Sequence, residues 1–200
     1  MFYDACKNEH GLPHDPFKSL VLPRPIGWIS SLSKTGVRNL APYSFFNAIG
    51  DKPHYVMFAS GGRKDSLRNI EETGEFVCNL ATYELRNQMN ETSASVTADI
   101  DEFARAGLTP VASTYVSPPR VGESPVALEC RYHQTVNLPA LPGAGTHYGV
   151  IIGQVVGIYI ADEYIVDGIV DVPAMRPIAR LGYKDYCSVD TIFSMDRPQT

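Results

Sequence analysis

The sequence predicts a mainly β protein, built as a mostly antiparallel barrel with a few short helices. Segments rich in β-branched and aromatic residues follow one another along most of the chain. Helical patterns are too few to separate every strand, which argues against a doubly wound parallel sheet. The 16 glycines and 15 prolines are spread out, as many turns require. Without a repeat or a linker, residues 1–200 are expected to form one domain.

The first elements are predicted to form a β-hairpin within residues 24–53. Two apolar runs, PIGWISSL and APYSFFNAI, flank the turn-like SKTG. The second run is interrupted by Pro42, Tyr43, Ser44 and Asn47, which a purely structural strand does not need. We therefore expect a ligand to lie against this part of the hairpin.

Further strands and helices are expected along the rest of the chain. Strand patterns cover residues 56–60, 75–81, 126–136 and 148–166. In the last of these, Gly157 predicts a bulge and Asp162 a turn. Helical patterns cover residues 64–73, ended by Gly74, and residues 83–94 and 101–108.

The global composition argues against several classes of partner. The formal net charge of -5 disfavours a sequence-independent grip on nucleic acid or anionic lipid. No apolar run approaches the roughly 18 residues of a membrane span, and the N-terminus lacks the basic-then-apolar pattern of a signal peptide. The four cysteines, Cys6, Cys78, Cys130 and Cys187, are widely spaced. We expect reduced thiols in a cytoplasmic protein.

The segment Ser60-Gly61-Gly62-Arg63-Lys64-Asp65-Ser66 carries the sharpest local signal, because it leads from a predicted strand directly into a predicted helix. The glycines permit a tight turn, Asp65 or Ser66 can cap the helix, and the first helical turn leaves free N–H groups. With Arg63 and Lys64 this makes a compact anion site, suited to a phosphate. The alternative is an ordinary glycine turn with solvated charges.

Two other patterns bear on the kind of phosphate. The nucleoside-triphosphate loop G-x-x-x-x-G-K-[ST] is absent. The segment GAGTHYG (143–149) precedes a strand, whereas a dinucleotide fingerprint follows a strand and opens a helix, so we interpret it as a hairpin loop. This excludes a Rossmann-type dinucleotide site and leaves a mononucleotide phosphate open.

A metal site is not expected. Cys6, His10, His14 and Asp15 cluster in the sequence, but intervening prolines break any helix that would align them. We expect a polar N-terminal loop.

Taken together, these segments resemble the flavin reductase-like, FMN-binding split-barrel family, which includes flavoredoxins and the reductase components of two-component flavin monooxygenases. HDPFKSLVLPRPIGWISSLSKTGVRNLAPYSFFNAI resembles the opening hairpin of that family, and SGGRKDSLRNIEETGEFVCNL resembles its phosphate loop and next strand. ESPVALECR, GQVVGIYIADEYIVDGIVD and RPIARLGYKDY resemble its later blocks. The resemblance covers nearly the whole chain, in order.

The resemblance implies a noncovalent FMN site between the hairpin and the phosphate loop. Ser44 and the backbone around it suit the polar edge of the isoalloxazine ring or the ribityl chain, and Trp28 and Tyr183 are candidates for apolar cover. Phe46 is expected to be core instead. The phosphate loop would hold the phosphate, with Asp65 capping the helix. The expected cofactor-binding residues are Trp28, Ser30, Pro42, Tyr43, Ser44, Phe45, Asn47, Ser60, Arg63, Lys64, Asp65, Ser66 and Tyr183.

The chain departs from the family pattern at two places. Tyr183 stands where relatives often carry the second glycine of Arg-Leu-Gly-Gly, which affects the shape of the substrate pocket. Tyr159 stands where many relatives carry a histidine, so no catalytic acid or base is assigned.

The resemblance implies NAD(P)H-dependent flavin reduction, with hydride transfer from NAD(P)H to flavin N5. It also implies a homodimer with FMN near the interface, to which the N-terminal segment or the tail IFSMDRP of the second copy contributes. A monooxygenase or another redox protein would be the partner. Two alternatives stay open: an FMN-containing electron carrier reduced by a protein partner, and a non-enzymatic flavin- or haem-binding module.

Overall fold

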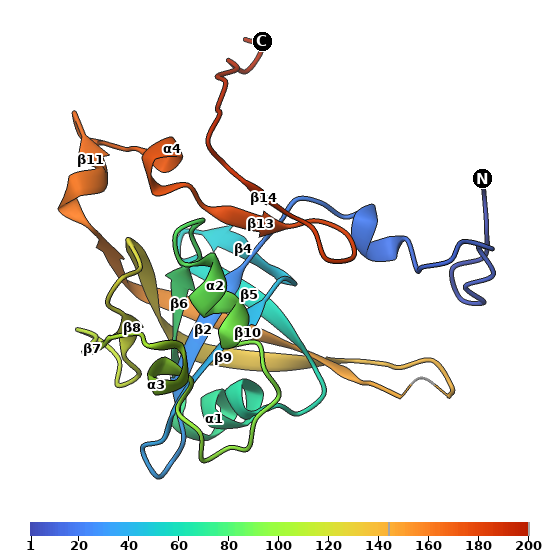
Figure 1. Ribbon diagram of the computed structural model, residues 1–200, viewed down its shortest axis with the longest axis horizontal. Helices are drawn as coiled ribbons and strands as arrows, with labels where there is room; N and C mark the ends of the chain where they lie inside the picture. Colours follow the sequence, from blue (N-terminus) through green and yellow to red (C-terminus); the bar gives the residue numbers. More distant parts are fainter. Residues whose placement is uncertain (144, 200) are drawn as a thin grey trace.

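A computed structural model describes residues 1–143 and 145–199. Ala144, within the predicted hairpin loop 143–149, and Thr200 lie outside the described residues. The main sheet has seven strands, each antiparallel to its neighbours, in the order β3-β2-β6-β9-β10-β5-β4 (Figure 1). The prediction of a mainly β, antiparallel fold is confirmed. The strands are β2 (Gly27–Leu32), β3 (Arg38–Tyr43), β4 (Phe46–Asp51), β5 (His54–Gly61), β6 (Glu75–Leu80), β9 (Val126–Leu138) and β10 (Tyr148–Ile160).

The sheet closes into a barrel at a corner of two residues. Strands β3 and β4 are the two outer strands of the sheet, yet only Ser44 and Phe45 separate them in the chain. The sheet must therefore curl until its edges meet. At this corner the N–H of Ala59 on β5 donates to the carbonyl of Phe45 at 2.8 Å. The corner joins the edges without a continuous ladder between β3 and β4.

The corner also corrects the predicted hairpin. Strands β2 and β3 do pair as predicted, with Trp28 opposite Pro42 and Leu32 opposite Arg38. The second apolar run divides after Tyr43, however, because β4 pairs with β5. The interruptions noted in the sequence mark this change of partner.

The helices lie outside the barrel and are shorter than predicted, except for the first. Helix α1 (Asp65–Thr73) ends at Gly74, whose φ of +80° favours glycine. Helices α2 (Arg86–Glu91) and α3 (Glu102–Ala106) each occupy only part of their predicted ranges, and α4 (Val172–Met175) was not predicted. Two 3-10 turns complete the helical elements, η1 (Phe17–Ser19) and η2 (Asp162–Tyr164). No helix among the described residues is long and apolar enough to cross a membrane.

Short strands form three small sheets at the periphery. Strand β1 (Arg24–Pro25) pairs with β13 (Ile178–Arg180), which pairs with β14 (Tyr186–Ser188). The pairs β7 (Pro110–Val111) with β8 (Arg120–Val121), and β11 (Ile165–Val166) with β12 (Ile169–Val170), are two-stranded. The β9–β10 register shifts between Val155 and Gly157, and β10 ends before Asp162. The predicted bulge and turn are both confirmed.

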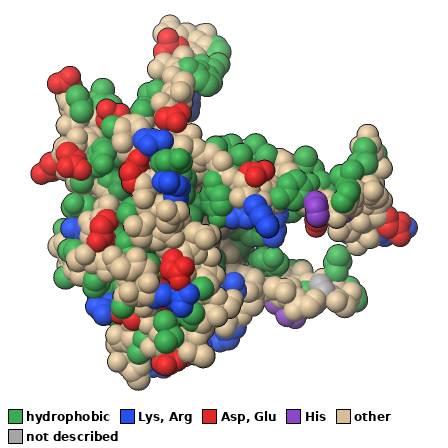
Figure 2. All heavy atoms as spheres, in the orientation of Figure 1, with side chains coloured by type: hydrophobic (Ala, Val, Ile, Leu, Met, Phe, Trp, Pro, Cys, Tyr) green, Lys and Arg blue, Asp and Glu red, His purple; other side chains and the backbone are tan. Residues whose placement is uncertain are grey.

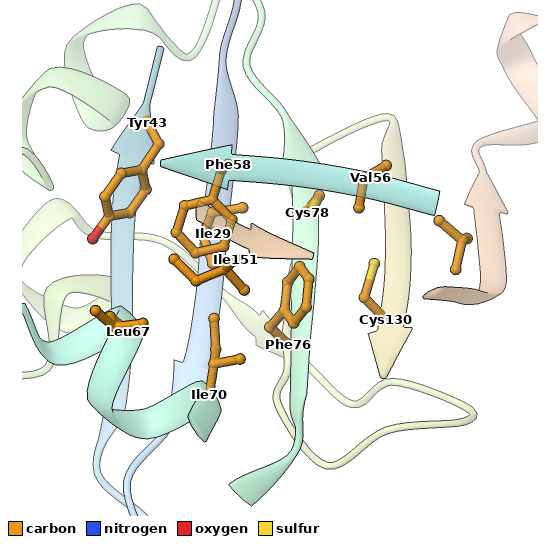
Figure 3. Packing of buried hydrophobic residues seen from close by; sticks show 11 residues of the cluster. Ile29, Tyr43, Val56, Phe58, Leu67, Ile70, Phe76, Cys78, Cys130 and Ile151 are labelled. Atoms are coloured by element: carbon orange, nitrogen blue, oxygen red, sulfur yellow. The ribbon is translucent and has the colours of Figure 1, made fainter. Parts of the chain in front are cut away.

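The main core fills the barrel and extends to α1. Phe58, Phe76 and Ile151 are fully buried and pack together, with Leu67 and Ile70 contributed by the helix (Figure 3). Phe46 packs against this cluster, as expected. A second cluster, which includes Trp28, Leu40, Met89 and Phe103, lies between the barrel and helices α2 and α3. The two clusters hold β2 and β3 from opposite faces.

Candidate functional site

A cavity of about 660 Å³ opens beside β3, between the barrel corner and the N-terminus of α1. Five parts of the chain form its wall: β3 with the corner, the end of β5 with the loop into α1, the segment after α2, the start of α3, and the start of β10 with the loop before it. The lining residues are Asn39, Ala41, Pro42, Tyr43, Ser44, Phe45, Ala59, Gly61, Arg63, Lys64, Asp65, Ser66, Thr92, Ser93, Ala94, Ser95, Val96, Glu102, Thr146 and Tyr148.

At one end, the cavity is lined by the first residues of helix α1. Lys64 is the N-cap with an extended backbone, and no side chain accepts from the first-turn N–H groups. These donors are therefore available to an anion, and the helix dipole favours one there. The predicted cap by Asp65 or Ser66 is wrong. Asp65 instead pairs with Arg68 one turn further on, and the Ser66 hydroxyl bonds the side chain of Asn39 at 2.9 Å.

The two predicted cations at this end differ in their partners. Arg63 forms an ion pair with Glu71 on the exposed side of α1. Lys64 has no ion pair with any residue that the structure describes. Lys64 is thus the cation available for a bound anion.

The other end of the cavity is aromatic. The rings of Phe45, at the corner, and Tyr148, at the start of β10, have centroids 6.0 Å apart. A Cβ atom on Gly61 would lie 3.3 Å from the Tyr148 ring, so the absence of a side chain there gives the ring its place. Ser44 adds a hydroxyl and a backbone N–H beside these rings.

Two buried acidic groups lie between the ends. The ring of Tyr43 packs on Phe58 with centroids 4.7 Å apart, and burial raises the pKa of its hydroxyl, although the side chains of Ser66 and Ser60 oppose the rise. Burial also raises the pKa of Glu102. The N–H of Leu40, which donates to the Glu102 carboxylate at 3.1 Å, partly offsets this rise. Both groups favour their neutral forms more than an exposed tyrosine or glutamate does.

Eight of the predicted cofactor-binding residues line this one cavity, although they come from two separate stretches of sequence. The hairpin contributes four and the phosphate loop four: Pro42, Tyr43, Ser44, Phe45, Arg63, Lys64, Asp65 and Ser66.

Five predicted residues lie elsewhere, and the predicted site is corrected accordingly. Trp28 is fully buried in the second core cluster, where its indole N–H donates to the Thr92 hydroxyl at 2.9 Å. Ser30 is also fully buried and donates to the carbonyl of Pro119 at 2.5 Å. Both side chains point away from the barrel interior, on the face of β2 opposite Ile29.

The other three predicted residues, Asn47, Ser60 and Tyr183, also do not line the cavity. Asn47 is exposed on β4, and its side chain accepts from the N–H of Ala48. Ser60 is buried behind the phosphate loop, where it donates to the carbonyl of Gly62 at 2.9 Å. Tyr183 is exposed in the β13–β14 loop with a φ of +51°, close to the ring of His14. That backbone conformation is one that glycine adopts readily.

Sequence reasoning missed part of the wall. Residues 92–94 of the segment TSASV (92–96) were assigned to the end of a helix, Glu102 to another helix, and Thr146 and Tyr148 to a hairpin loop, so none of them was expected at the site. The run of small hydroxyl residues in TSASV was the available signal. Tyr159 packs in a third cluster under the Arg120 guanidinium and does not line the cavity.

Comparisons with known proteins agree with this architecture. The model of the flavin reductase like domain matches residues 19–170. An uncharacterized protein from Aquifex aeolicus is 38% identical over 173 residues, which cover 84% of this chain and 85% of that protein.

Two solved structures extend the comparison. Nitrilotriacetate monooxygenase component B from Bacillus cereus has a TM-score of 0.86 and 29% identity, with 98% of each chain covered. A Shewanella frigidimarina protein described as a flavin reductase with a split barrel domain has a TM-score of 0.83 and 22% identity, covering 99% of this chain and 100% of that one. The fold is thus a split barrel, and the chain belongs to the flavin reductase-like domain family.

Proposed function

We propose that this chain binds FMN noncovalently in the cavity beside β3 and catalyses flavin reduction by NAD(P)H. The observation that carries the proposal is the cavity itself, which has an uncapped helix N-terminus with Lys64 at one end and an aromatic corner at the other. The family membership supports the choice of a flavin over other mononucleotides.

The residues present fit FMN in size and polarity. A volume of about 660 Å³ lies within the range of roughly 300–1,000 Å³ that is usual for small-molecule sites. The first-turn N–H groups of α1 and Lys64 would hold the phosphate. Ser44 and the backbone beside Phe45 would meet the polar edge of the ring, with Tyr148 near one side. Bound FMN would supply the redox chemistry, because it can accept a hydride at N5.

The contribution of the chain is positioning and electrostatics. N–H donors near the polar edge of the ring favour negative charge there, and a fixed phosphate holds the ring in one orientation. No histidine lines the cavity among the described residues, and hydride transfer itself needs no protein acid or base. We therefore assign no catalytic residue.

The same proposal includes a homodimer. Three segments project from the barrel: the N-terminal residues, the β9–β10 tip and the C-terminal tail (Figure 1). In the space-filling view, two of them flank an open hollow on the right (Figure 2). Large apolar side chains on these segments are exposed, among them Phe17, Leu138 and Phe193, the last by 85%. Such exposure favours cover by a partner, and a second copy would also close the flavin site.

The proposal extends to the physiological setting. Similarity to a monooxygenase component supports delivery of reduced flavin to a separate monooxygenase. Free thiols at all four cysteines support a cytoplasmic location.

The test of the proposed ligand is a set of binding titrations with FMN, riboflavin and FAD. We expect one FMN per chain, bound more tightly than riboflavin, which lacks the phosphate, and than FAD, which carries an additional nucleotide. Equal binding of FMN and riboflavin would contradict the phosphate site, and tighter binding of FAD would contradict the mononucleotide assignment.

A further inference from the structure

A buried hydrogen-bond network connects β3 to the first turn of α1, in the wall of the cavity. The Asn39 side-chain amide donates to the Ser66 hydroxyl at 2.9 Å and to the Ser31 hydroxyl at 3.2 Å. Asn39 is 7% exposed, and Ser66 and Ser31 are 1% and 0% exposed. Hydrogen bonds between buried polar groups are costly to break, because the remaining partner cannot turn to water.

Tyr43 lies on the same face of β3 as Asn39, since side chains alternate along a strand, and Ser66 is one of the groups that act on the pKa of its hydroxyl. Figure 3 shows the Tyr43 ring beside the barrel core, above α1. Ser66, the second residue of α1, is therefore held to β3 by the side-chain amide of Asn39.

These links join the two ends of the cavity. Tyr43 directly precedes the corner residues Ser44 and Phe45, and Ser66 belongs to the helical turn whose free N–H groups line the opposite end. The Ser66 hydroxyl accepts from the Asn39 amide through one of its lone pairs, which ties the first turn of α1 to β3.

We infer that Asn39 and Ser66 are positioning residues, which fix the first-turn N–H groups of α1 relative to the corner and so set the affinity for the flavin phosphate. This inference rests on the proposed function. It assigns to Asn39 a role in discriminating phosphorylated from unphosphorylated flavin, although Asn39 need not touch the phosphate. Loss of the amide would let the helix N-terminus shift, and a shift of its N–H groups weakens several phosphate contacts together.

The test compares FMN and riboflavin binding to Asn39→Ala. We expect the dissociation constant for FMN to rise at least about tenfold, equivalent to about 1.4 kcal/mol, and that for riboflavin to change by less than about twofold. The matched control is Asn69→Ala. Asn69 is equally buried, and its amide donates within the same cluster, but to Ser31 at 3.3 Å and one turn further along α1. This variant should lose thermal stability and keep the wild-type ratio of FMN to riboflavin affinity.

A double-mutant cycle with Ser66→Ala separates coupling from independent damage. If Asn39 acts through Ser66, the double variant should lose little more FMN affinity than either single variant. Should Asn39→Ala fail to fold, Ser66→Ala, which removes one oxygen atom, must give the same selective loss of FMN. The positioning role would be overturned if Asn39→Ala weakened the binding of FMN and riboflavin equally. It would also be overturned if Asn69→Ala changed the ratio of FMN to riboflavin affinity as much as Asn39→Ala does. A wild-type protein that binds both flavins equally would overturn the proposed phosphate site and this inference together.

Discussion

Replacing Lys64 with alanine should weaken FMN binding more than replacing Arg63, although the two residues are adjacent in the predicted phosphate loop. The difference follows from their partners. Lys64 lies at the N-cap of α1 and has no ion pair with a described residue, whereas the Arg63 guanidinium is paired with Glu71. A cation that already has a carboxylate partner contributes less to a second anion.

The magnitude can be worked from these contacts. A hydrogen bond to a charged group contributes about 1.5–3 kcal/mol, and exposure at the cavity rim favours the lower end because solvent screens the charge. For Lys64→Ala we expect a loss of about 1.4–2 kcal/mol, which raises the dissociation constant for FMN about 10- to 30-fold. For Arg63→Ala, whose side chain is 60% exposed, we expect less than about a threefold rise. Riboflavin binding should be unaffected by either change.

Calorimetric or fluorescence titration of each variant with FMN and with riboflavin measures these changes in dissociation constant. Glu71→Ala is the matched control, because it releases Arg63 without touching Lys64, and it should leave FMN binding unchanged or tighten it slightly. The Lys64 effect should shrink as salt rises from about 0.15 M to about 1 M, where the Debye length falls from roughly 8 Å to 3 Å. An Arg63→Ala loss as large as that of Lys64→Ala, or equal losses for both flavins, would refute the reasoning.

Three further predictions test the fold, the buried carboxylate and the assembly. Trp28→Phe removes the indole donor to Thr92 and should lower the free energy of unfolding by about 1–2 kcal/mol in urea titrations, with FMN affinity within about threefold of wild type; a selective loss of FMN would return Trp28 to the site. Burial raises the pKa of Glu102 above 4.5, so in the window between 4.5 and the raised value the folded state keeps a proton that the unfolded state has lost, and stability falls as pH rises. Glu102→Gln should abolish that fall, and identical pH slopes for the two proteins would contradict the assignment. Light scattering should give about twice the chain mass of 22.0 kDa, and a flavin-loaded monomer would rule out a shared site.

The strands were predictable because their signal is local. Segments such as 126–136 and 148–166 are rich in β-branched residues over long stretches, and β9 and β10 form there as the longest strands of the sheet. The bulge near Gly157 and the turn at Asp162 are equally local. The corner at Ser44–Phe45 was not predictable in this way, because it depends on the meeting of the two opposite edges of a seven-stranded sheet.

The candidate site was predicted in part for the same reason. Residues 60–66 and the end of β3 are continuous segments, and each was proposed for the site from its own residues. Trp28 and Ser30 lie outside the cavity, and the sequence did not indicate this because β2 is buried on both faces, so alternation along the strand did not reveal which face meets the barrel interior. The cap by Asp65 failed because Arg68, three residues on, offered the carboxylate a charged partner. The segment 92–96 and Tyr148 reach the cavity only through the tertiary fold.

We propose that this chain passes electrons from NAD(P)H to FMN held beside β3. The most direct measurement is anaerobic mixing of the FMN-loaded protein with NADH or NADPH, followed by the flavin absorbance. We predict rapid bleaching with at least one of the two nucleotides, slowed in Lys64→Ala at subsaturating FMN and restored when FMN is raised. Flavin that stays oxidised with both nucleotides, or bleaches no faster than free FMN, would contradict the claim.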